Sequence, residues 1–466
     1  MLQSVSLSNY PITNTSFGIL KKKVEKPVSN PVQNSQPIQS KVVSQGVVQT
    51  RTVLNEAEKK KYNALVSKLA NAQSKNSNGL KPTQQLDVLL KNGKLLSKSQ
   101  HDNSTTLDNL YNIATIKRAN GLDSTILLTD TLDTLVNPRF ITQTFGDIPN
   151  ELKPAIAQSL SKDNPVKQDY EQMNVYSSGT CAAASLEVNM ADKLPAEFAR
   201  WVSDLSSEKM QVDLNVKLSA LTQNPLDSLM LLRLLEAQKI SSDFNSAKIK
   251  VDLDEGAHIR ACVQTRYWNP GERNVADVLI HSAIMKLGSQ NTYNSLNDVR
   301  EGKYSANPQG LVEIEKTFVE SLIKNKEITS ITYQYIDSDQ NLADYYCTPE
   351  QTQKHIMYAI DSGDNVILGY VETNQSSGLI NSPEYDASIH GGPNKVINGH
   401  EITVVDYYKD EKGEVIFVCI DTDDNSPDLI QYSSSFLIPR IHHAGYPAHL
   451  VEEDSKEILK KISAVE

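Results

Sequence analysis

The residue with the clearest chemical potential is Cys181, which lies in the stretch Ser-Ser-Gly-Thr-Cys-Ala-Ala-Ala-Ser-Leu-Glu, residues 177–187. Thr180 and the two serines before it are residue types that favour the N-cap of a helix, and the alanines after the cysteine have high helix propensity. The pattern predicts a helix with Cys181 in its first turn. The unpaired backbone N–H groups there favour a thiolate, which is a nucleophile. The alternative is an ordinary buried cysteine on a helix of small residues.

A histidine and an aspartate late in the chain are predicted to meet. Two apolar runs, residues 401–408 and 414–420, flank the segment 410–413, whose sequence Asp-Glu-Lys-Gly suits a type I turn closed by a glycine. This pattern predicts an antiparallel hairpin. His400 stands at the head of the first run and Asp421 follows the second, so the hairpin places the two side chains next to each other.

The predicted pair has the chemistry of a general base. A carboxylate that holds one imidazole nitrogen fixes the tautomer and supports the positive charge that forms when the ring accepts a proton. Asp421 directly ends the apolar run and is the first choice for this carboxylate. Asp423 has the same parity along the strand and is the second choice. Cys181, His400 and one of these aspartates would form a nucleophile, a base and a group that orients the base.

Three sequence features together resemble a known enzyme family. They are the Gly-Thr turn before Cys181, the Gly-His at the head of a late strand (residues 398–405, Asn-Gly-His-Glu-Ile-Thr-Val-Val), and the aspartate that closes its partner (residues 418–421, Val-Cys-Ile-Asp). In this order, over about residues 165–450, they resemble the papain-like cysteine peptidases. The chain is most similar to the bacterial branch that includes bacteriocin-leader-processing peptidases. The resemblance implies an α+β fold, in which a helical half bearing the nucleophile packs against an antiparallel β-sheet half bearing the base.

The resemblance also implies a reaction and an oxyanion donor. Cysteine peptidases of this type hydrolyse peptide bonds, so a peptide or protein is the expected substrate, and no cofactor is expected. In this family a glutamine about six residues before the nucleophile usually supplies an oxyanion donor, but Val175 stands at that position. Gln172 and Asn174 are the nearest residues that could replace it.

Two other functions fit the same residues. Transglutaminase-type enzymes use a cysteine, a histidine and an aspartate in the same order, so an amine or small thiol in place of water would make the chain an acyltransferase or amidase. A non-enzymatic interaction or effector protein on an inactive papain-like fold is the third possibility.

Charge and composition divide the chain. Residues 1–100 carry 15 Lys and Arg against 4 Asp and Glu, a net charge of +11, and the remainder carries 31 against 53, a net charge of −22. We predict a basic, disordered arm with one short helix over residues 1–84, a helical lead-in region over 85–164, and a papain-like domain with helical insertions over 165–466. The arm is interpreted either as a tail for export or partner contact or as a segment that restrains the active site.

Periodicity predicts the elements that position these residues. Helices are expected near residues 55–71, 107–119, 124–135, 227–238, 275–287, 311–323 and 349–363, with a further helix that begins at Pro195 after the Cys181 helix. Strands are expected at 210–218 and 366–372, and a Gly-, Asn- and Ser-rich loop at 373–399. Most of the long middle of the chain is therefore predicted to be helical.

Several classes of protein are disfavoured. No apolar run approaches the roughly 20 residues of a spanning helix, and the N-terminus lacks the layout of a classical signal peptide, so we expect a cytoplasmic protein or one exported by another route. The basic runs lack arginine and aromatic residues, so no nucleic-acid partner is predicted. The four cysteines have no paired spacing, which argues against a disulfide framework and a zinc cluster.

The remaining histidines have simple interpretations. His442 and His443, with His449 nearby, could suggest a metal site, but no carboxylate or cysteine lies at a matching spacing, so a surface or packing role is predicted. His281 lies in an apolar helical run and is expected to be a core histidine. No metal site is therefore predicted from the sequence.

Overall fold

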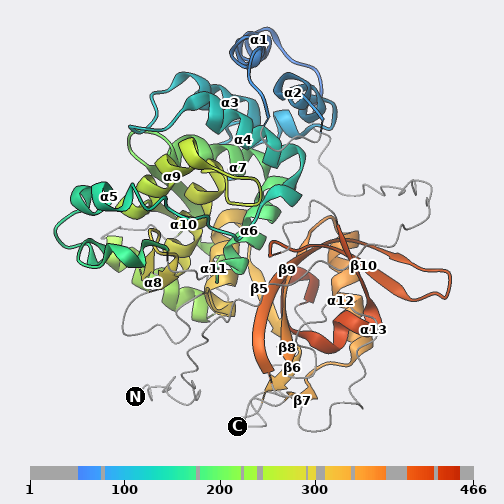
Figure 1. Cartoon of the computed structure of the whole chain (residues 1–466). Coiled ribbons are helices and arrows are strands. Elements are labelled where there is room, and N and C mark those ends of the chain that lie inside the picture. The colour runs from blue at the N-terminus through green and yellow to red at the C-terminus, as the bar shows by residue number, and fades with distance from the viewer. Residues whose placement is uncertain are drawn as a thin grey trace, which may run out of the picture.

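The computed structural model describes residues 51–74, 79–174, 179–221, 225–238, 245–289, 292–300, 310–336, 342–373, 396–423 and 429–451. The chain combines helices with antiparallel sheets, and the two kinds of element are largely segregated. Figure 1 shows the helices from the first two thirds of the chain gathered on one side, and the strands of the last third on the other.

The helical side contains α1 to α11 and two small two-stranded sheets. The helices are α1 (Glu56–Leu69), α2 (Pro82–Lys91), α3 (Thr106–Thr115), α4 (Ser124–Val136), α5 (Lys153–Ser159), α6 (Cys181–Lys193), α7 (Pro195–Leu205), α8 (Pro225–Gln238), α9 (Glu255–Tyr267), α10 (Val275–Gly288) and α11 (Glu313–Lys324). The paired short strands are β1 (Gln211–Lys217) with β2 (Ser246–Asp252), and β3 (Tyr293–Asn294) with β4 (Val299–Arg300).

A six-stranded sheet forms the other side, with the strand order β11-β10-β9-β8-β12-β5, and every adjacent pair in it is antiparallel. Its strands are β5 (Ile328–Thr332), β8 (Val366–Thr373), β9 (Val396–Lys409), β10 (Val415–Ile420), β11 (Ile430–Ser433) and β12 (Ile441–Pro447). The hairpin β6 (Gln334–Ile336) and β7 (Leu342–Tyr345) and the helices α12 (Pro349–Asp361) and α13 (Ser434–Leu437) complete this part.

The sheet is buried on both faces. Successive side chains of a strand point to opposite faces, and the alternation is visible in β8, where Ile367 joins the hydrophobic core of the helices and Leu368 joins a second core. The same holds at the end of β10, where Ile420 joins the first core and Cys419 the second. The helix α12 packs against β8 and β9. The six-stranded sheet therefore lies between the helical core and a smaller core that includes α12.

The helix α6 lies at the centre of the molecule. Every residue from Ala182 to Ala191 is buried, and the helix contacts α7, α10, α11 and β9. Its three consecutive alanines have short side chains, which allows neighbouring elements to approach closely. On the sheet side the Ser185 hydroxyl donates to the Glu401 carbonyl oxygen of β9, at 3.3 Å. The first turn of α6 is thus fixed relative to the strand that carries His400.

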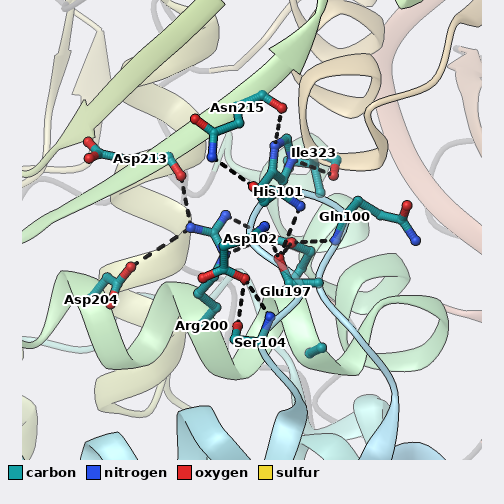
Figure 2. A network of polar contacts seen from close by, with 12 residues as sticks. Gln100, His101, Asp102, Ser104, Glu197, Arg200, Asp204, Asp213, Asn215 and Ile323 are labelled. Carbon is teal, nitrogen blue, oxygen red and sulfur yellow. Dashed lines mark hydrogen bonds and ion pairs between the residues drawn. The ribbon is translucent and has the colours of Figure 1, made fainter.

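A buried polar network joins the segment after α2 to α7, β1 and α11 (Figure 2). Glu197 forms a buried ion pair with Arg200, at 2.7 Å between Oε2 and Nη2, and also accepts a hydrogen bond from the Gln100 N–H. The His101 ring lies between two carbonyl oxygens, with Nδ1 at 3.0 Å from that of Asn215 and Nε2 at 3.2 Å from that of Ile323. Buried polar groups are costly unless they have partners, so this network fixes the position of the segment.

Several local predictions are confirmed. The helix α1 begins after Asn55, which forms a capping box with Glu58. The helices α4, α6, α7, α10 and α12, and the strands β1, β8 and β10, begin within two residues of the expected positions. The turn between β9 and β10 also forms as expected, with the Gly413 N–H donating to the Asp410 carbonyl oxygen and a φ of 82° at Gly413.

Other predictions are corrected. The expected loop at 373–399 extends too far, because residues 396–399 belong to β9, and residues 374–395 lie outside the described part. The helix expected at 107–119 ends at Thr115. The middle of the chain also holds strands that were not predicted, including β2 and β5. In β2 polar residues alternate with the buried Ala247, Ile249 and Val251, so a strand signal was present in the sequence. In β5 the five residues have no regular alternation, and the strand is defined by its pairing with β12.

The predicted domain boundaries stay predictions, but the core crosses both of them. Leu65 and Leu69 of α1 pack in the same hydrophobic cluster as Leu86 of α2 and Leu186 of α6. The described helix α1 is therefore part of the folded core. Residues 1–50, predicted to be disordered, lie outside the described residues.

Candidate active site

The helix α6 begins at Cys181, as predicted, with Thr180 as its N-cap residue. Thr180 does not cap the helix with its own side chain, because its buried hydroxyl accepts a hydrogen bond from Arg273 Nη2. Its carbonyl oxygen accepts the first intrahelical bond, from the Ala184 N–H, at 2.9 Å. The cysteine, which is partly exposed, is therefore held at the positive end of a buried helix.

The imidazole of His400 and the carboxylate of Asp421 form a hydrogen bond, with 2.7 Å between Nε2 and Oδ1. The two residues come from adjacent strands, since Ile420 pairs with Thr403 across β10 and β9 and Asp421 follows directly. Both side chains are almost buried, with 9% and 8% exposure. Because Asp421 occupies Nε2, Nδ1 is the ring nitrogen that is left for the Cys181 sulfur.

Opposing effects act on the pKa of His400. Burial disfavours the charged ring and would lower this pKa. Hydrogen bonds to Asp421 and to Cys181, and the negative charges of both groups, act in the opposite direction and prevail, so the pKa of His400 is raised well above 6.5. The arrangement therefore stabilises an imidazolium placed between a carboxylate and a cysteine.

The structure separates the two candidate aspartates. Oδ1 of Asp421 accepts hydrogen bonds from His400 Nε2 and from the backbone N–H of Asp423, the latter at 3.0 Å. The side chain of Asp423 is exposed. Asp423 thus contributes a main-chain donor that orients Asp421, while the carboxylate beside the histidine is that of Asp421.

An aromatic ring fixes the other side of the imidazole. Tyr370 of β8 pairs with His400 across the sheet, and their ring centroids lie 5.6 Å apart with an interplanar angle of 89°. This edge-to-face packing restricts rotation of the histidine ring. Tyr370 is buried, so it also keeps water from this side of the site.

The backbone of Gln143, which was not connected with the site from the sequence, is linked both to the residue after Asp421 and to the residue before Cys181. Gln143 donates its backbone N–H to the Thr422 carbonyl oxygen, at 3.0 Å, directly after Asp421. Its own carbonyl oxygen accepts from Arg273 Nη2 at 2.6 Å, and the same nitrogen donates to Thr180 directly before Cys181. The Gln143 backbone is therefore tied to both sides of the Cys–His–Asp group.

The side chain of Gln143 has an unusual environment. It is 4% exposed, and its Oε1 has no hydrogen-bond partner in the described part of the chain. A buried amide with unused hydrogen-bonding capacity is costly and commonly marks a functional position. No local pattern pointed to Gln143, because it precedes the nucleophile by 38 residues and not by the expected six.

The oxyanion candidates named from the sequence are not placed in detail. Gln172 and Asn174 belong to the 3₁₀ helix Tyr170–Asn174, and their side chains lie outside the described part of the structure. Val175 also lies outside it.

Arg273 supports the site from the core. Its guanidinium is fully buried, lies 3.4 Å from Asp298 and stacks 4.5 Å from the ring centroid of Phe145. Burial would lower the pKa of Arg273, but Asp298 and its neighbours outweigh burial and raise it. A permanent cation therefore holds the turn before the nucleophile.

A second buried polar group lies further along α6. His281 is buried, as predicted for a core histidine, and its Nε2 lies 2.6 Å from Oε2 of Glu187. Burial is the main reason that the pKa of Glu187 is raised well above 4.5 and that of His281 lowered well below 6.5. Both shifts favour the uncharged form of the group. The pair is enclosed in the core and is not adjacent to solvent.

Comparisons of the chain with protein-family models, with curated proteins and with solved structures gave no match. The site is therefore interpreted from its own geometry. Within the described ranges, no helix combines the length and the apolar character needed to cross a bilayer.

Proposed function

We propose that the chain is a cysteine peptidase of papain-like fold, with Cys181 as the nucleophile, His400 as the base and Asp421 as the residue that positions the base. The observation that carries this proposal is the geometry of His400, which is bonded to Asp421 through Nε2 and whose pKa is raised by Asp421 and by Cys181 at the start of α6. The four cysteines are free, which fits a thiol enzyme in a reducing compartment.

The proposed reaction uses these groups in sequence. Cys181 Sγ attacks the carbonyl carbon of a peptide bond while His400 holds the thiol proton. The imidazolium then gives this proton to the leaving amine, and a water molecule activated by His400 hydrolyses the thioester. Asp421 keeps the ring oriented and balances its charge throughout.

The oxyanion of the tetrahedral intermediate needs donors near Cys181. We assign one donor to the Cys181 backbone N–H, which belongs to the unpaired first turn of α6. We assign the second to the side-chain Nε2–H of Gln143, because the Gln143 backbone is tied to Thr180 through Arg273 and the side chain is buried beside this turn.

Alkylation tests the nucleophile without knowledge of the substrate. Iodoacetamide at pH 6 should modify Cys181 well before Cys262, which is also partly exposed but has a pKa raised by burial. His400→Ala should abolish this preference, whereas Cys262→Ala should leave the rate of Cys181 modification unchanged. Equal modification of Cys181 and Cys262 in the native chain would contradict the proposal.

Cleavage is then measured on a mixture of denatured proteins, with new N-termini identified by mass spectrometry. Cys181→Ala should produce none, while Cys262→Ala should match the native chain. If Cys181 is selectively alkylated but only an added amine is incorporated into the substrate, the same triad performs acyl transfer. A selectively reactive cysteine with neither activity would exclude the peptidase for these substrates and favour an effector on an inactive fold.

A further inference from the structure

The most informative group outside the proposed active site consists of Glu313, His442 and His443. The metal-ligating atoms of these three side chains all lie within 4.8 Å of one another. Glu313 is the first residue of α11, and the histidines are consecutive residues of β12. The carboxylate precedes the histidines by 129 residues, so no spacing in the sequence could reveal the group.

Consecutive residues of a regular strand point to opposite faces, but His442 and His443 do not. The reason is a break in the pairing of β12 with β8: Ile441 pairs with Tyr370 and His443 with Gly369, which leaves His442 as an extra residue. A β-bulge of this kind re-aims side chains, and such bulges are frequent next to functional sites. As a result, the two Nδ1 atoms face each other at 2.9 Å.

The surroundings of His443 fix its tautomer. Its Nε2 lies 2.8 Å from Oε1 of Glu401, and the other oxygen of this carboxylate is 2.9 Å from Nζ of the buried Lys316. A carboxylate acceptor places the proton on Nε2, so in the neutral ring Nδ1 is left with its lone pair. A carboxylate behind the far nitrogen of a histidine is the usual support of a metal ligand.

Glu313 is oriented in a complementary way. Its Oε1 accepts hydrogen bonds from the hydroxyls of Ser330 and Thr332 on β5, and its Oε2 lies 4.0 Å from Nδ1 of His443. Tetrahedral ligands at zinc distances are about 3.3 Å apart. The separations of 2.9 and 4.0 Å lie on either side of this value, so small side-chain rotations would suffice.

Charge and space also suit a cation. Lys316 balances Glu401, so the charge of Glu313 is available to a cation. Gly369 lies under the His443 ring, where a Cβ atom would be only 2.3 Å from Cε1. The side chains of His443 and Glu313 keep 11% and 23% exposure, which leaves a path for an ion and room for a water ligand.

We propose that Glu313, His442 and His443 bind a zinc-class divalent cation through Oε2 and the two Nδ1 atoms, with a water molecule in the fourth position. The cation would join α11 of the helical side to β12 of the sheet. Glu401 would connect it to β9, next to His400. The competing explanation is a proton shared between the two Nδ1 atoms, and the experiment below separates the two.

Zinc binding is measured on the full chain carrying Cys181→Ser, because the Cys181–His400 pair could itself bind zinc. After treatment with EDTA and dialysis, the protein is titrated with Zn²⁺ against a chromophoric chelator. We expect one equivalent to bind. Loss of a group that hydrogen-bonds to a metal ligand typically weakens metal binding by roughly 10–100-fold, and Glu401→Gln should fall within that range. Glu313→Gln and His442→Ala each remove a proposed ligand and should weaken zinc binding by more than this.

His449→Ala is the matched control, because this histidine is exposed and close in sequence. It should leave the affinity unchanged. Co²⁺ bound to the Cys181→Ser chain should give a tetrahedral d–d spectrum without a thiolate-to-cobalt band, a readout that needs no further variant to fold. The proposal would be overturned if zinc did not bind stoichiometrically or if the cobalt spectrum were octahedral. It would also be overturned if the Cys181→Ser chain bound zinc equally well with and without His442→Ala. The remaining explanation would be a pair of histidines that share a proton.

Discussion

His400 and Glu401 are neighbours on β9, yet they belong to two different polar groups. His400 bonds to Asp421 and its pKa is raised by Asp421 and by Cys181 at the start of α6. Glu401 bonds to His443 and to Lys316 in the first turn of α11. In both groups a carboxylate holds one nitrogen of an imidazole and leaves the other for a reactive partner, a thiol in the first and a cation in the proposed second.

The difference between the two groups lies in how they are assembled. The Cys–His–Asp group uses a helix start and a hairpin, both of which have local sequence signals. The Glu–His–His group needs a β-bulge to turn His442 and a helix from a distant part of the chain to deliver Glu313. The same carboxylate–imidazole chemistry is therefore predictable from the sequence where local elements present it, and not predictable where a bulge and a distant helix present it.

The largest effect is expected from removal of the carboxylate of the Cys–His–Asp group. Asp421→Ala should lower kcat/KM by about 10³–10⁴-fold, because loss of the carboxylate releases the tautomer and orientation of the imidazole. Asp423→Ala is the control, since it keeps the main-chain N–H that bonds to Asp421. Peptide cleavage measured for both variants checks the ranking, and the reverse ranking would refute the assignment.

Arg273→Met removes the cation that supports the turn before Cys181. We expect a loss of about 3–5 kcal/mol in the free energy of unfolding, because the buried Asp298 loses the charged partner that lies 3.4 Å away. Chemical denaturation measures this. Arg266→Met on the exposed face of α9 is the control, and it should change stability by less than about 0.5 kcal/mol. Similar losses in both variants would contradict a special role for Arg273.

Gln143→Ala tests the proposed oxyanion donor. Removing one donor typically lowers kcat by about 10²–10³-fold. The control is Gln264→Ala, which removes another buried glutamine amide that bonds to the same segment, at the Phe145 carbonyl oxygen. Turnover of the folded protein is compared for the two variants. An equal effect on kcat would show that Gln143 only stabilises the segment.

The pKa of His400 provides a smaller but direct measure of the carboxylate's charge. In a Cys181→Ala background, Asp421→Asn should lower this pKa, because it removes one of the charges that raise it. A raised pKa contributes stability below the unfolded value of 6.5, and this contribution disappears as pH rises through the folded pKa. NMR titration of the His400 ring checks the direction, and an unchanged pKa would mean that Asp421 acts through geometry alone.

The smallest expected effect concerns the basic N-terminal residues. Removing residues 1–84 would delete α1, whose Leu65 and Leu69 are buried in the core, so the informative truncation is residues 1–50. We expect unchanged peptide cleavage at low and at high salt, as for a tail that contacts neither polar group. Activation that is strongest at low salt would instead indicate electrostatic restraint, which salt screens over about 10 Å at 0.1 M.

Local residue patterns were sufficient to predict the elements that carry the Cys–His–Asp group. The small-residue run after Thr180 predicts the helix that starts at Cys181, and the apolar runs around residues 410–413 predict the hairpin that joins His400 to Asp421. These predictions succeeded because helix starts and tight turns depend on residues within a few positions of each other. The mixed α and β composition followed from the same signals.

The contacts between residues far apart in the chain became known from the folded structure. It placed Gln143 between Thr422 and Arg273, gave the carboxylate position to Asp421 in place of Asp423, and brought Glu313 to the two histidines of β12. Such contacts depend on strand register, on a bulge and on the packing of α6 and α11 against the sheet. Register and packing are fixed by the burial of whole faces, and no local pattern of residues records them.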